Sequence, residues 1–421
     1  MQRRLRLTIA VLLLTLLAAE PAPATTEREL PLASLQASRV QKALSLARRH
    51  HRRNVLRWTE LCRIPALSGQ EEARAKEVRE QLAALGLKII DRTDGNVEAV
   101  LVGRRPELPP GVLCAHLDAL HAPTEENPIR LNGTLLTGPG VLDDGSGLAG
   151  LLTAARSLTT VGYQGERSLH FLATVREEVG LEGMKSYLET ASPLPAAVVS
   201  IDGILGGVDY GATGIIWKRF RFLGRGGHAL LSPRTPSPAF GAGRAIAGLA
   251  DLAEEIDVPL NVGVLQGGTR PNAIPAEVSF TVDVRSTDAE ELARLERQIS
   301  RIVRSAAARE AVKVEEELLQ GLPAARLPGH GRSRLVLGAV DILEWLGVPA
   351  RAHPRGSSDH NVALLRGIPA IAVGTTVGRG AHSPAEQADT EAFLEGSQQV
   401  ILLAVLLGEG LENAPGPQAA Q

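Results

Sequence analysis

The sequence predicts an α/β protein in which a mainly parallel sheet carries helices on its faces and a smaller α+β domain is inserted. Two patterns predict this fold: short aliphatic runs alternate with helical segments in the first half, and the order strand, helix, strand, strand, helix, strand fills residues 213–320. The length of 421 residues agrees with more than one domain, since one domain takes roughly 100–200 residues.

Three aliphatic runs, over residues 112–115, 169–175 and 196–201, predict strands that are buried on both faces. They are followed by His116-Leu-Asp118, Arg176-Glu177-Glu178 and Asp202-Gly203, respectively. The carboxyl ends of strands in an open α/β sheet border the reactive crevice, so we expect these polar groups to converge. Between the first two runs, a glycine-rich turn directs Asp143 to the same crevice before a helix over 148–158.

The inserted segment predicts a self-contained βαββαβ domain of the ferredoxin-like type. Its expected strands cover 215–223, 260–266, 276–285 and 312–319, and its expected helices cover 239–256 and 288–307. A linker over 321–331 then returns to α/β patterning, with a helix near 332–346 and a strand at 368–373. The main domain is therefore expected in two parts, 25–212 and 321–410, followed by a disordered tail over 411–421.

The first 24 residues predict a cleaved signal peptide. Three arginines among the first six residues precede an apolar run over 7–19, and Ala22-Pro23-Ala24 is a small-residue cleavage site. The run is short for a membrane span of ~20 residues, although a retained N-terminal anchor is the alternative. We expect a periplasmic or secreted protein with no stable membrane insertion after cleavage.

The composition is that of an ordinary folded protein. Hydrophobic residues make up 44% of the chain, charged residues 22%, and the formal net charge is -2, which excludes a disordered or polybasic chain. The 3 Trp, 3 Tyr and 6 Phe leave few surfaces for base stacking, so nucleic acid is not an expected partner. Cys62 and Cys114 are too few for a disulfide framework and lack the CxxC spacing of metal ligands.

The polar groups beyond the strands offer the imidazole nitrogens and carboxylate oxygens that suit zinc and related divalent ions. The candidate ligands are His116, Asp143, Glu178, Asp202 and His382. One ion needs three or four ligands, so this set is enough for two ions ~3.5–4 Å apart if one carboxylate bridges them. Asp118 can fix the tautomer of His116, and Glu177 is free to act as a general base.

Each motif alone also has an ordinary structural explanation. A His-x-Asp at a strand end is more often structural than catalytic, two adjacent glutamates usually face solvent, and Asp-Gly after a strand normally forms a turn. Their joint placement favours a site, because a structural explanation leaves several carboxylates converging without a counter-charge.

This ordered set of motifs resembles the M20 metallopeptidases, the family that includes the carboxypeptidase G and peptidase T types. The resemblance covers essentially residues 45–410 and includes the stretch Arg270-Pro-Asn272-Ala-Ile-Pro275. The segment Arg355-Gly-Ser-Ser-Asp359 looks like the peptidase T branch.

The resemblance implies a role for each candidate residue. His116 and Asp202 would hold one zinc, Glu178 and His382 the other, and Asp143, the first residue of the Asp-Asp pair, would bridge them. Asp118 and Glu177 would be catalytic. The inserted domain would be a lid and dimerisation domain that lends His228 to the partner's active site, and Arg355 would bind the substrate carboxylate. Asn272 is a further candidate for substrate binding, and cobalt or manganese could substitute for zinc.

The predicted function is therefore zinc-dependent cleavage of an amide bond in small peptides or N-acyl amino acids, by a homodimer, through a metal-bridging water activated by Glu177. One departure leaves an alternative open: Gly145-Ser-Gly147 stands where the family usually has Lys-Gly, and this pattern is closer to the M28 aminopeptidases. The inserted domain between Asp202 and His382 favours M20. A catalytically silent peptide-binding protein on the same fold is the second alternative.

Overall fold

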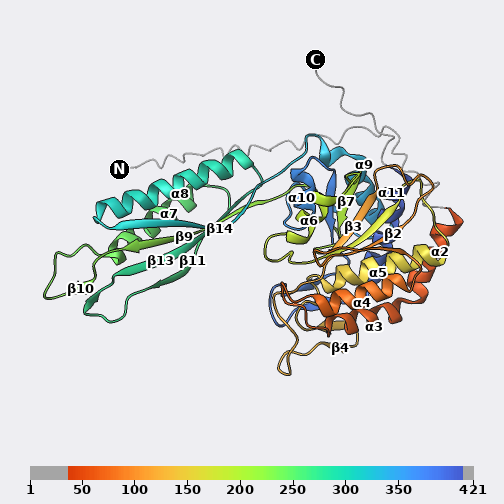
Figure 1. The fold of residues 1–421 in the computed structure, drawn as a ribbon, viewed down its shortest axis with the longest axis horizontal. Coiled ribbons are helices and arrows are strands. Elements are labelled where there is room, and N and C mark those ends of the chain that lie inside the picture. Colours follow the sequence, from red (N-terminus) through yellow and green to blue (C-terminus); the bar gives the residue numbers. More distant parts are fainter. Residues whose placement is uncertain (1–36, 411–421) are drawn as a thin grey trace, which may run out of the picture.

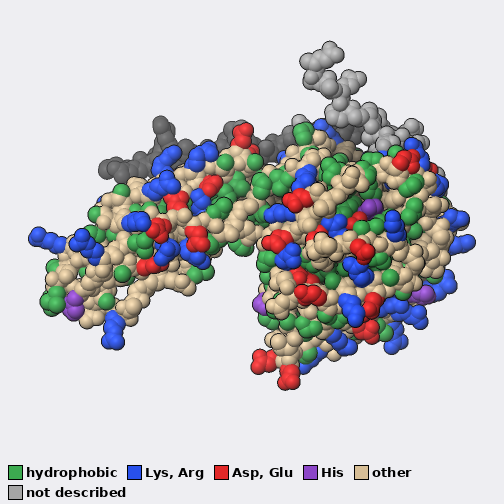
Figure 2. Space-filling view, in the orientation of Figure 1, with side chains coloured by type: hydrophobic (Ala, Val, Ile, Leu, Met, Phe, Trp, Pro, Cys, Tyr) green, Lys and Arg blue, Asp and Glu red, His purple; other side chains and the backbone are tan. Residues whose placement is uncertain are grey.

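The computed structural model describes residues 37–410, which form two units, each built on its own sheet (Figure 1). The predicted signal peptide and the predicted C-terminal tail lie outside the described residues. Figure 2 shows an open gap between the two units on the face that it presents.

The larger unit contains an eight-stranded sheet of order β1-β2-β6-β3-β7-β16-β8-β15. Its central strands are parallel to one another: β6 (Leu169–Thr174), β3 (Gly111–His116), β7 (Ala197–Ser200) and β16 (Ala370–Val373). The outer strands include antiparallel pairs: β1 (Lys88–Ile90), β2 (Val97–Leu101), β8 (Gly207–Asp209) and β15 (Arg351–His353). The sheet is thus mixed but mainly parallel at its centre, as predicted.

Helices cover both faces of this sheet because the central strands are apolar on both sides. In β3, Leu113 and Ala115 belong to one buried cluster, whereas Val112 and Cys114 belong to another. The first cluster is completed by α2 (Ser38–Arg49), α4 (Glu72–Ala83), α5 (Gly145–Thr160), α9 (Arg334–Trp345) and α11 (Phe393–Glu409). The second is completed by α6 (Glu182–Thr190) and α10 (His360–Leu365). Helix α3 (His51–Cys62) packs on α5.

A second, small sheet brings the end of the chain to the start of α5. Its order is β17-β18-β5-β4, formed by Gly378–Arg379, Gln387–Asp389, Leu135–Thr137 and Arg130–Asn132. The backbone N–H of Gly138 also donates to the carbonyl of Glu386 at 3.0 Å. These contacts place the segment that contains His382 beside the loop that contains Asp143.

The smaller unit has the βαββαβ order expected from the sequence. Its elements are β9 (Gly214–Leu223), α7 (Pro238–Glu255), β11 (Leu260–Gly267), β13 (Glu277–Ser286), α8 (Ala289–Arg309) and β14 (Lys313–Leu322). The strands form an antiparallel sheet of order β11-β13-β9-β14, and its core includes Phe220, Phe222 and Phe280 with residues of both helices. A two-stranded ribbon of β10 (Gly227–His228) and β12 (Ala273–Ile274) lies at the end of this unit away from the eight-stranded sheet (Figure 1).

No helix within residues 37–410 is both long and apolar enough to span a membrane. The most apolar one, α11, is buried along nearly its whole length against the main sheet and its neighbouring helices.

Candidate metal centre

The carboxyl ends of three adjacent parallel strands place the predicted residues at one edge of the main sheet. His116 is the last residue of β3, Glu177 and Glu178 follow β6, and Asp202 follows β7. One ligand atom each from His116, Asp143 and Glu178 lies within 4.8 Å of the others. This closeness is what the sequence predicts for groups at neighbouring strand ends.

Asp143 lies between the two candidate histidine ligands. Its Oδ1 is 2.9 Å from Nε2 of His116, and its Oδ2 is 3.0 Å from Nε2 of His382. Nε2 of His382 is also 3.4 Å from Oε2 of Glu178. A carboxylate with one oxygen beside each of two histidines would be able to hold cations together with them.

The neighbouring Asp144 has a different role. Its Oδ2 accepts the backbone N–H of His116 at 2.9 Å, and its Oδ1 accepts the N–H of Gly147 at 3.0 Å, which caps α5. A Cβ atom at Gly147 would lie only 1.9 Å from the carbonyl oxygen of Ile201. A Cβ atom at Gly145, the position directly after the Asp-Asp pair, would lie 2.4 Å from Sγ of Cys62 and 2.5 Å from the carbonyl oxygen of Gly140. Packing therefore favours glycine at both positions of Gly145-Ser-Gly147.

Asp118 orients three groups of the site. Its Oδ1 accepts the backbone N–H of Glu177 at 3.0 Å, and its Oδ2 accepts the N–H of Glu178 at 3.2 Å and the hydroxyl of Ser68 at 2.7 Å. Nδ1 of His116 is 3.0 Å from the carbonyl oxygen of Asp118 and 3.4 Å from its Oδ1. With Nδ1 occupied in this way, Nε2 of His116 is left to face Asp143.

Asp202 lies close to this group without belonging to its most compact part. Burial, together with the negative charge of Asp143, raises the pKa of its carboxyl to about 6, although a hydrogen bond from Ser358 acts in the opposite direction. Ser358 is itself held by a 2.8 Å hydrogen bond to the hydroxyl of Ser200. Asp202 would therefore act electrostatically on a cation held beside Asp143.

The site has more buried negative charge than its histidines balance. Burial raises the pKa of the Glu177 carboxyl well above its usual range, and burial with the charge of Asp143 raises that of Glu178 to about 7. The hydrogen bond to Asp143, in turn, raises the pKa of His382 to about 9. Divalent cations would remove this electrostatic conflict, and the imidazole and carboxylate donors are those that zinc-class ions accept. The residues present therefore fit a metal centre.

Three buried residues support the site and escaped the sequence analysis. Oε2 of Glu386 accepts the backbone N–H groups of Leu142 and Asp143 at 3.0 and 3.1 Å, and so fixes the loop that carries the bridging candidate. Arg74 donates to the carbonyl of Leu117 at 2.8 Å, between His116 and Asp118. Neither residue belongs to a motif or a periodic pattern that would have identified it.

Asp359 is the third of these residues. Its Oδ2 accepts the hydroxyl of Thr174 at 2.6 Å, and its Oδ1 has no hydrogen-bond partner among the described residues. Burial raises the pKa of this carboxyl to about 7. The family resemblance includes the segment Arg355-Gly-Ser-Ser-Asp359 but implies a role for Arg355 alone.

The three predicted substrate-binding residues lie outside the compact group. Arg355 is exposed at the start of the loop that leads to Ser358, and its charge acts on Asp209. His228 and Asn272 are exposed on the ribbon of the smaller unit, where the carbonyl of Asn272 accepts the N–H of Ala229 at 3.0 Å.

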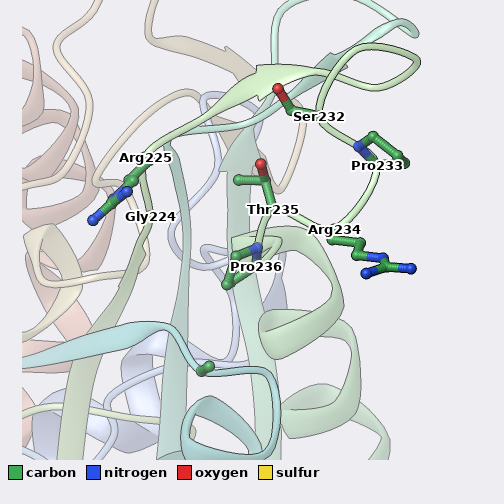
Figure 3. Close-up of a pocket in the computed structure, with 8 residues that line it drawn as sticks. Gly224, Arg225, Ser232, Pro233, Arg234, Thr235 and Pro236 are labelled. Carbon is green, nitrogen blue, oxygen red and sulfur yellow. The ribbon is translucent and has the colours of Figure 1, made fainter.

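A cavity beside this ribbon does not form a second reactive centre. It has a volume of about 640 Å³ and lies next to the loop that follows β10. Figure 3 shows that Arg225 and Arg234, its charged residues, point away from each other. The cavity therefore lacks the convergence of polar groups seen at the strand ends.

Comparisons with known proteins agree with this geometry. Residues 112–405 match the pattern of the peptidase family M20/M25/M40. Carboxypeptidase G2 of Pseudomonas sp. (strain RS-16) is 25% identical over 311 residues, which cover 71% of this chain and 74% of that protein.

Solved structures share the fold. A tripeptidase from Staphylococcus aureus superposes with a TM-score of 0.76 at 20% identity, covering 86% of this chain and 99% of that one. A dinuclear metal-binding peptidase of the M20 family from Bacillus subtilis superposes with a TM-score of 0.67 at 22% identity, covering 86% and 99%. Because the family pattern spans most of the described residues and includes the whole metal centre, the chain belongs to the peptidase family M20/M25/M40 and is a metallopeptidase-type hydrolase.

Proposed function

We propose that the protein binds two zinc ions per chain and cleaves an amide bond in a small peptide or an N-acyl amino acid. The observation that carries this proposal is the position of Asp143, whose two oxygens face two different histidines at 2.9 and 3.0 Å. With Glu178 and Asp202 beside this pair, each of two ions would find protein ligands on either side of one shared carboxylate.

When bound, such ions would polarise the scissile carbonyl and lower the pKa of a water molecule toward ~7. Glu177 is the group that takes the proton from the attacking water and passes it to the leaving nitrogen. Its buried carboxyl has a raised pKa, so it can hold a proton between the two transfers. Asp118 fixes the backbone of Glu177 through its N–H, which keeps the base in place.

Substrate recognition is proposed to involve residues from two chains. Arg355 offers a planar, two-pronged donor for a substrate carboxylate. His228 and Asn272 lie at the end of the smaller unit away from the main sheet of their own chain, and we propose that a second copy presents them (Figure 1). Leu230 and Leu231, in the loop that follows β10, are 79% and 77% exposed. Such exposure is unusual for aliphatic side chains, and a partner subunit would cover them.

Activity on a substrate panel tests the function. Purified protein loaded with zinc should cleave at least one class among dipeptides, tripeptides and N-acyl amino acids, each supplied with free and with blocked termini. A requirement for a free N-terminus would identify an aminopeptidase, and a requirement for a free carboxylate would identify a carboxypeptidase or deacylase. Two bound ions without hydrolysis of any amide would contradict the proposal and favour a silent binding protein.

We also propose that the protein is exported and loses its first 24 residues. The support is the basic, apolar and small-residue pattern of that segment. N-terminal sequencing of the protein recovered outside the cytoplasm should begin at residue 25, and an intact N-terminus in the membrane fraction would indicate a retained anchor instead.

A further inference from the structure

A surface of one-sided positive charge covers the first two helices of the larger unit, α2 and α3. Between residues 37 and 63, Glu60 is the single acidic residue, against the basic residues Arg39, Lys42, Arg48, Arg49, Arg52, Arg53, Arg57 and Arg63. All of these basic residues except the half-buried Arg57 are exposed, and we call the exposed ones the α2–α3 basic surface. Lys and Arg side chains gather along the edge of the larger unit where these helices lie (Figures 1 and 2).

The packing of the two helices directs these cations outward. One face of each helix is buried, and its apolar residues are Val40, Ala43, Leu44 and Ala47 in α2 and Val55, Trp58, Leu61 and Cys62 in α3. Only His50 separates the two helices, so their outer faces follow one another along the chain. Because the core covers the apolar faces, the charged faces are the ones that a partner can reach.

Little negative charge balances this surface. None of its cations forms an ion pair with another residue of the range 37–410 that the structure describes. Burial lowers the pKa of the neighbouring Arg57, and the positive charge of Arg53 lowers it more than the charge of Glu60 raises it. The acidic groups that act on His51 are Glu395 and Glu391, near the start of α11. Repulsion between like charges therefore remains on the outer face of α3.

Helix α4, which packs on the same side of the main sheet, has the mixed charge of an ordinary exposed helix. Its charged residues are Glu72, Arg74, Lys76, Glu77, Arg79 and Glu80. Lys76 lies 3.9 Å from Glu80, one turn further along. Opposite charges at this spacing stabilise a helix, whereas like charges such as Arg53 and Arg57 destabilise it. Fold stability thus favours mixed charge, and the one-sided charge of α2 and α3 favours a role in binding a strongly anionic partner.

We propose that the α2–α3 basic surface docks the protein on a membrane rich in acidic phospholipids. Its cations are spread along two consecutive helices, which suits a planar array of headgroups better than a single bound anion. Leu56, which is 47% exposed, lies one turn from Arg52 and Arg53 and offers an apolar side chain to the headgroup region. Few aromatic residues are present for base stacking, which argues against nucleic acid as the anionic partner.

The position of this surface in the chain also favours a membrane. Residues 20–36 connect the apolar run over 7–19 to α2, a connection that spans at most about 60 Å when fully extended. A membrane that takes up this run is therefore within reach of α2 and α3. Helix α2 lies at the end of the larger unit away from the smaller unit, so docking leaves the smaller unit free (Figure 1). The proposal depends neither on the metal centre nor on the hydrolytic activity.

Co-sedimentation with lipid vesicles tests the proposal. The chain that starts at residue 25 is used, because the apolar run over 7–19 would bind any bilayer and both units lie within residues 37–410. At low salt, this chain should sediment with phosphatidylglycerol vesicles and stay in solution with phosphatidylcholine vesicles. Raising the salt from about 0.1 M to about 1 M should release it, since the Debye length falls from ~10 Å to ~3 Å.

Removal of charge measures the contribution of the surface. Each cation near an acidic lipid surface strengthens binding roughly fivefold. The joint substitutions Arg48→Gln, Arg49→Gln, Arg52→Gln and Arg53→Gln should therefore weaken binding to phosphatidylglycerol vesicles by about tenfold or more. All four positions are exposed, so the melting temperature should not fall.

The matched control removes the same charge from the smaller unit. It carries the α8 substitutions Arg294→Gln, Arg297→Gln, Arg301→Gln and Arg309→Gln, all at exposed positions. This variant should bind like the unsubstituted chain. An equal loss of binding in the two variants would show that net charge alone is responsible and would overturn the proposal.

Replacement of the same four arginines of α2 and α3 by lysine separates lipid docking from recognition by paired donors. Attraction to a lipid surface depends on charge, so the lysine variant should bind vesicles like the unsubstituted chain. If it loses binding as the glutamine variant does, the surface serves a partner that requires the guanidinium geometry, such as an acidic protein, and the proposal is overturned. An unsubstituted chain that ignores phosphatidylglycerol vesicles, or that sediments equally with phosphatidylcholine vesicles, would overturn it as well.

Discussion

The carboxyl edge of the main sheet and the ribbon of the smaller unit were both predicted to contribute to one active site, yet they differ in how they are built. At the edge, His116, Asp143 and Glu178 already lie within 4.8 Å of one another in a single chain. On the ribbon, His228 and Asn272 are exposed, and the backbone hydrogen bonds that hold them come from residues of their own unit.

This difference shows which part of a site one chain can assemble. Neighbouring parallel strands are fixed by backbone hydrogen bonds, so residues at their ends converge as soon as the sheet forms. Within residues 37–410, no strand pairing connects the ribbon to the sheet edge. The ribbon can contribute only if the two units close on each other or if a second copy supplies it.

Among these substitutions, removal of the buried His116 at the sheet edge should reduce activity the most. His116→Ala should lower the metal content and reduce amide hydrolysis about 10³-fold or more, because a bound ion contributes several kcal/mol to catalysis. Elemental analysis and kcat measurements on the same samples check this. His353→Ala, on the edge strand β15, should retain both ions and activity. Unchanged metal content in His116→Ala would remove this residue from the ligand set.

The two adjacent glutamates should separate proton transfer from metal binding. Glu177→Gln keeps the shape but cannot accept a proton, so it should retain metal and lose roughly 10²-fold or more in kcat. Glu178→Gln should instead weaken metal binding. If Glu177→Gln turns over like wild type, or if it alone loses metal, the assignment of the pair is wrong.

The ribbon can be tested by complementation between chains. His228→Ala should lower kcat by roughly 10²-fold, because a donor beside the scissile carbonyl acts mainly on the oxyanion in the transition state. Mixing His228→Ala with Glu177→Gln should restore part of the activity, since a hybrid dimer contains one site with both residues intact. A monomer in light scattering with full activity would exclude the contribution of a second copy, and closure within one chain would be the remaining explanation.

Arg355 should affect binding more than turnover. Loss of a charge-assisted hydrogen bond costs about 1.5–3 kcal/mol, so Arg355→Ala should raise KM for free-acid peptides roughly tenfold or more. The same peptides as C-terminal amides should change little. Arg351→Ala removes an equally exposed arginine from β15 and should leave both KM values unchanged. Equal losses on acid and amide substrates would exclude the carboxylate-binding role and favour the aminopeptidase alternative.

Glu386 should give the smallest effect, because it acts through the loop that carries Asp143. Glu386→Ala removes the acceptor for two backbone N–H groups and should weaken metal binding about tenfold, the lower end of the range for groups that orient ligands. Glu386→Gln keeps a carbonyl oxygen and should largely restore the affinity. Equal metal affinity in Glu386→Ala and wild type would mean that the loop is held without this side chain.

The sequence was most informative where an apolar run that predicts a strand is followed directly by a candidate ligand or catalytic residue. The run Val112 to Ala115 predicted a strand buried on both faces, and the same run located His116 at its end. The position of the βαββαβ unit followed from alternating and helical patterns in the same way.

Single residues with no pattern could not be found. Glu386 and Asp359 act through contacts with residues more than 180 positions away, such as Glu386 with Leu142 and Asp359 with Thr174. Only the tertiary fold creates those contacts.

The small sheet formed by β17, β18, β5 and β4 has a consequence for biosynthesis. It is completed only when the chain has been made to about residue 389, and it positions both His382 and Glu386. A ribosome-stalled or proteolytically shortened product that ends before β17 would contain the whole smaller unit and all eight strands of the main sheet, yet it would lack His382, a proposed metal ligand, and the support that Glu386 gives to the Asp143 loop. Hydrolytic activity is therefore expected only after nearly the entire polypeptide has been synthesised and folded.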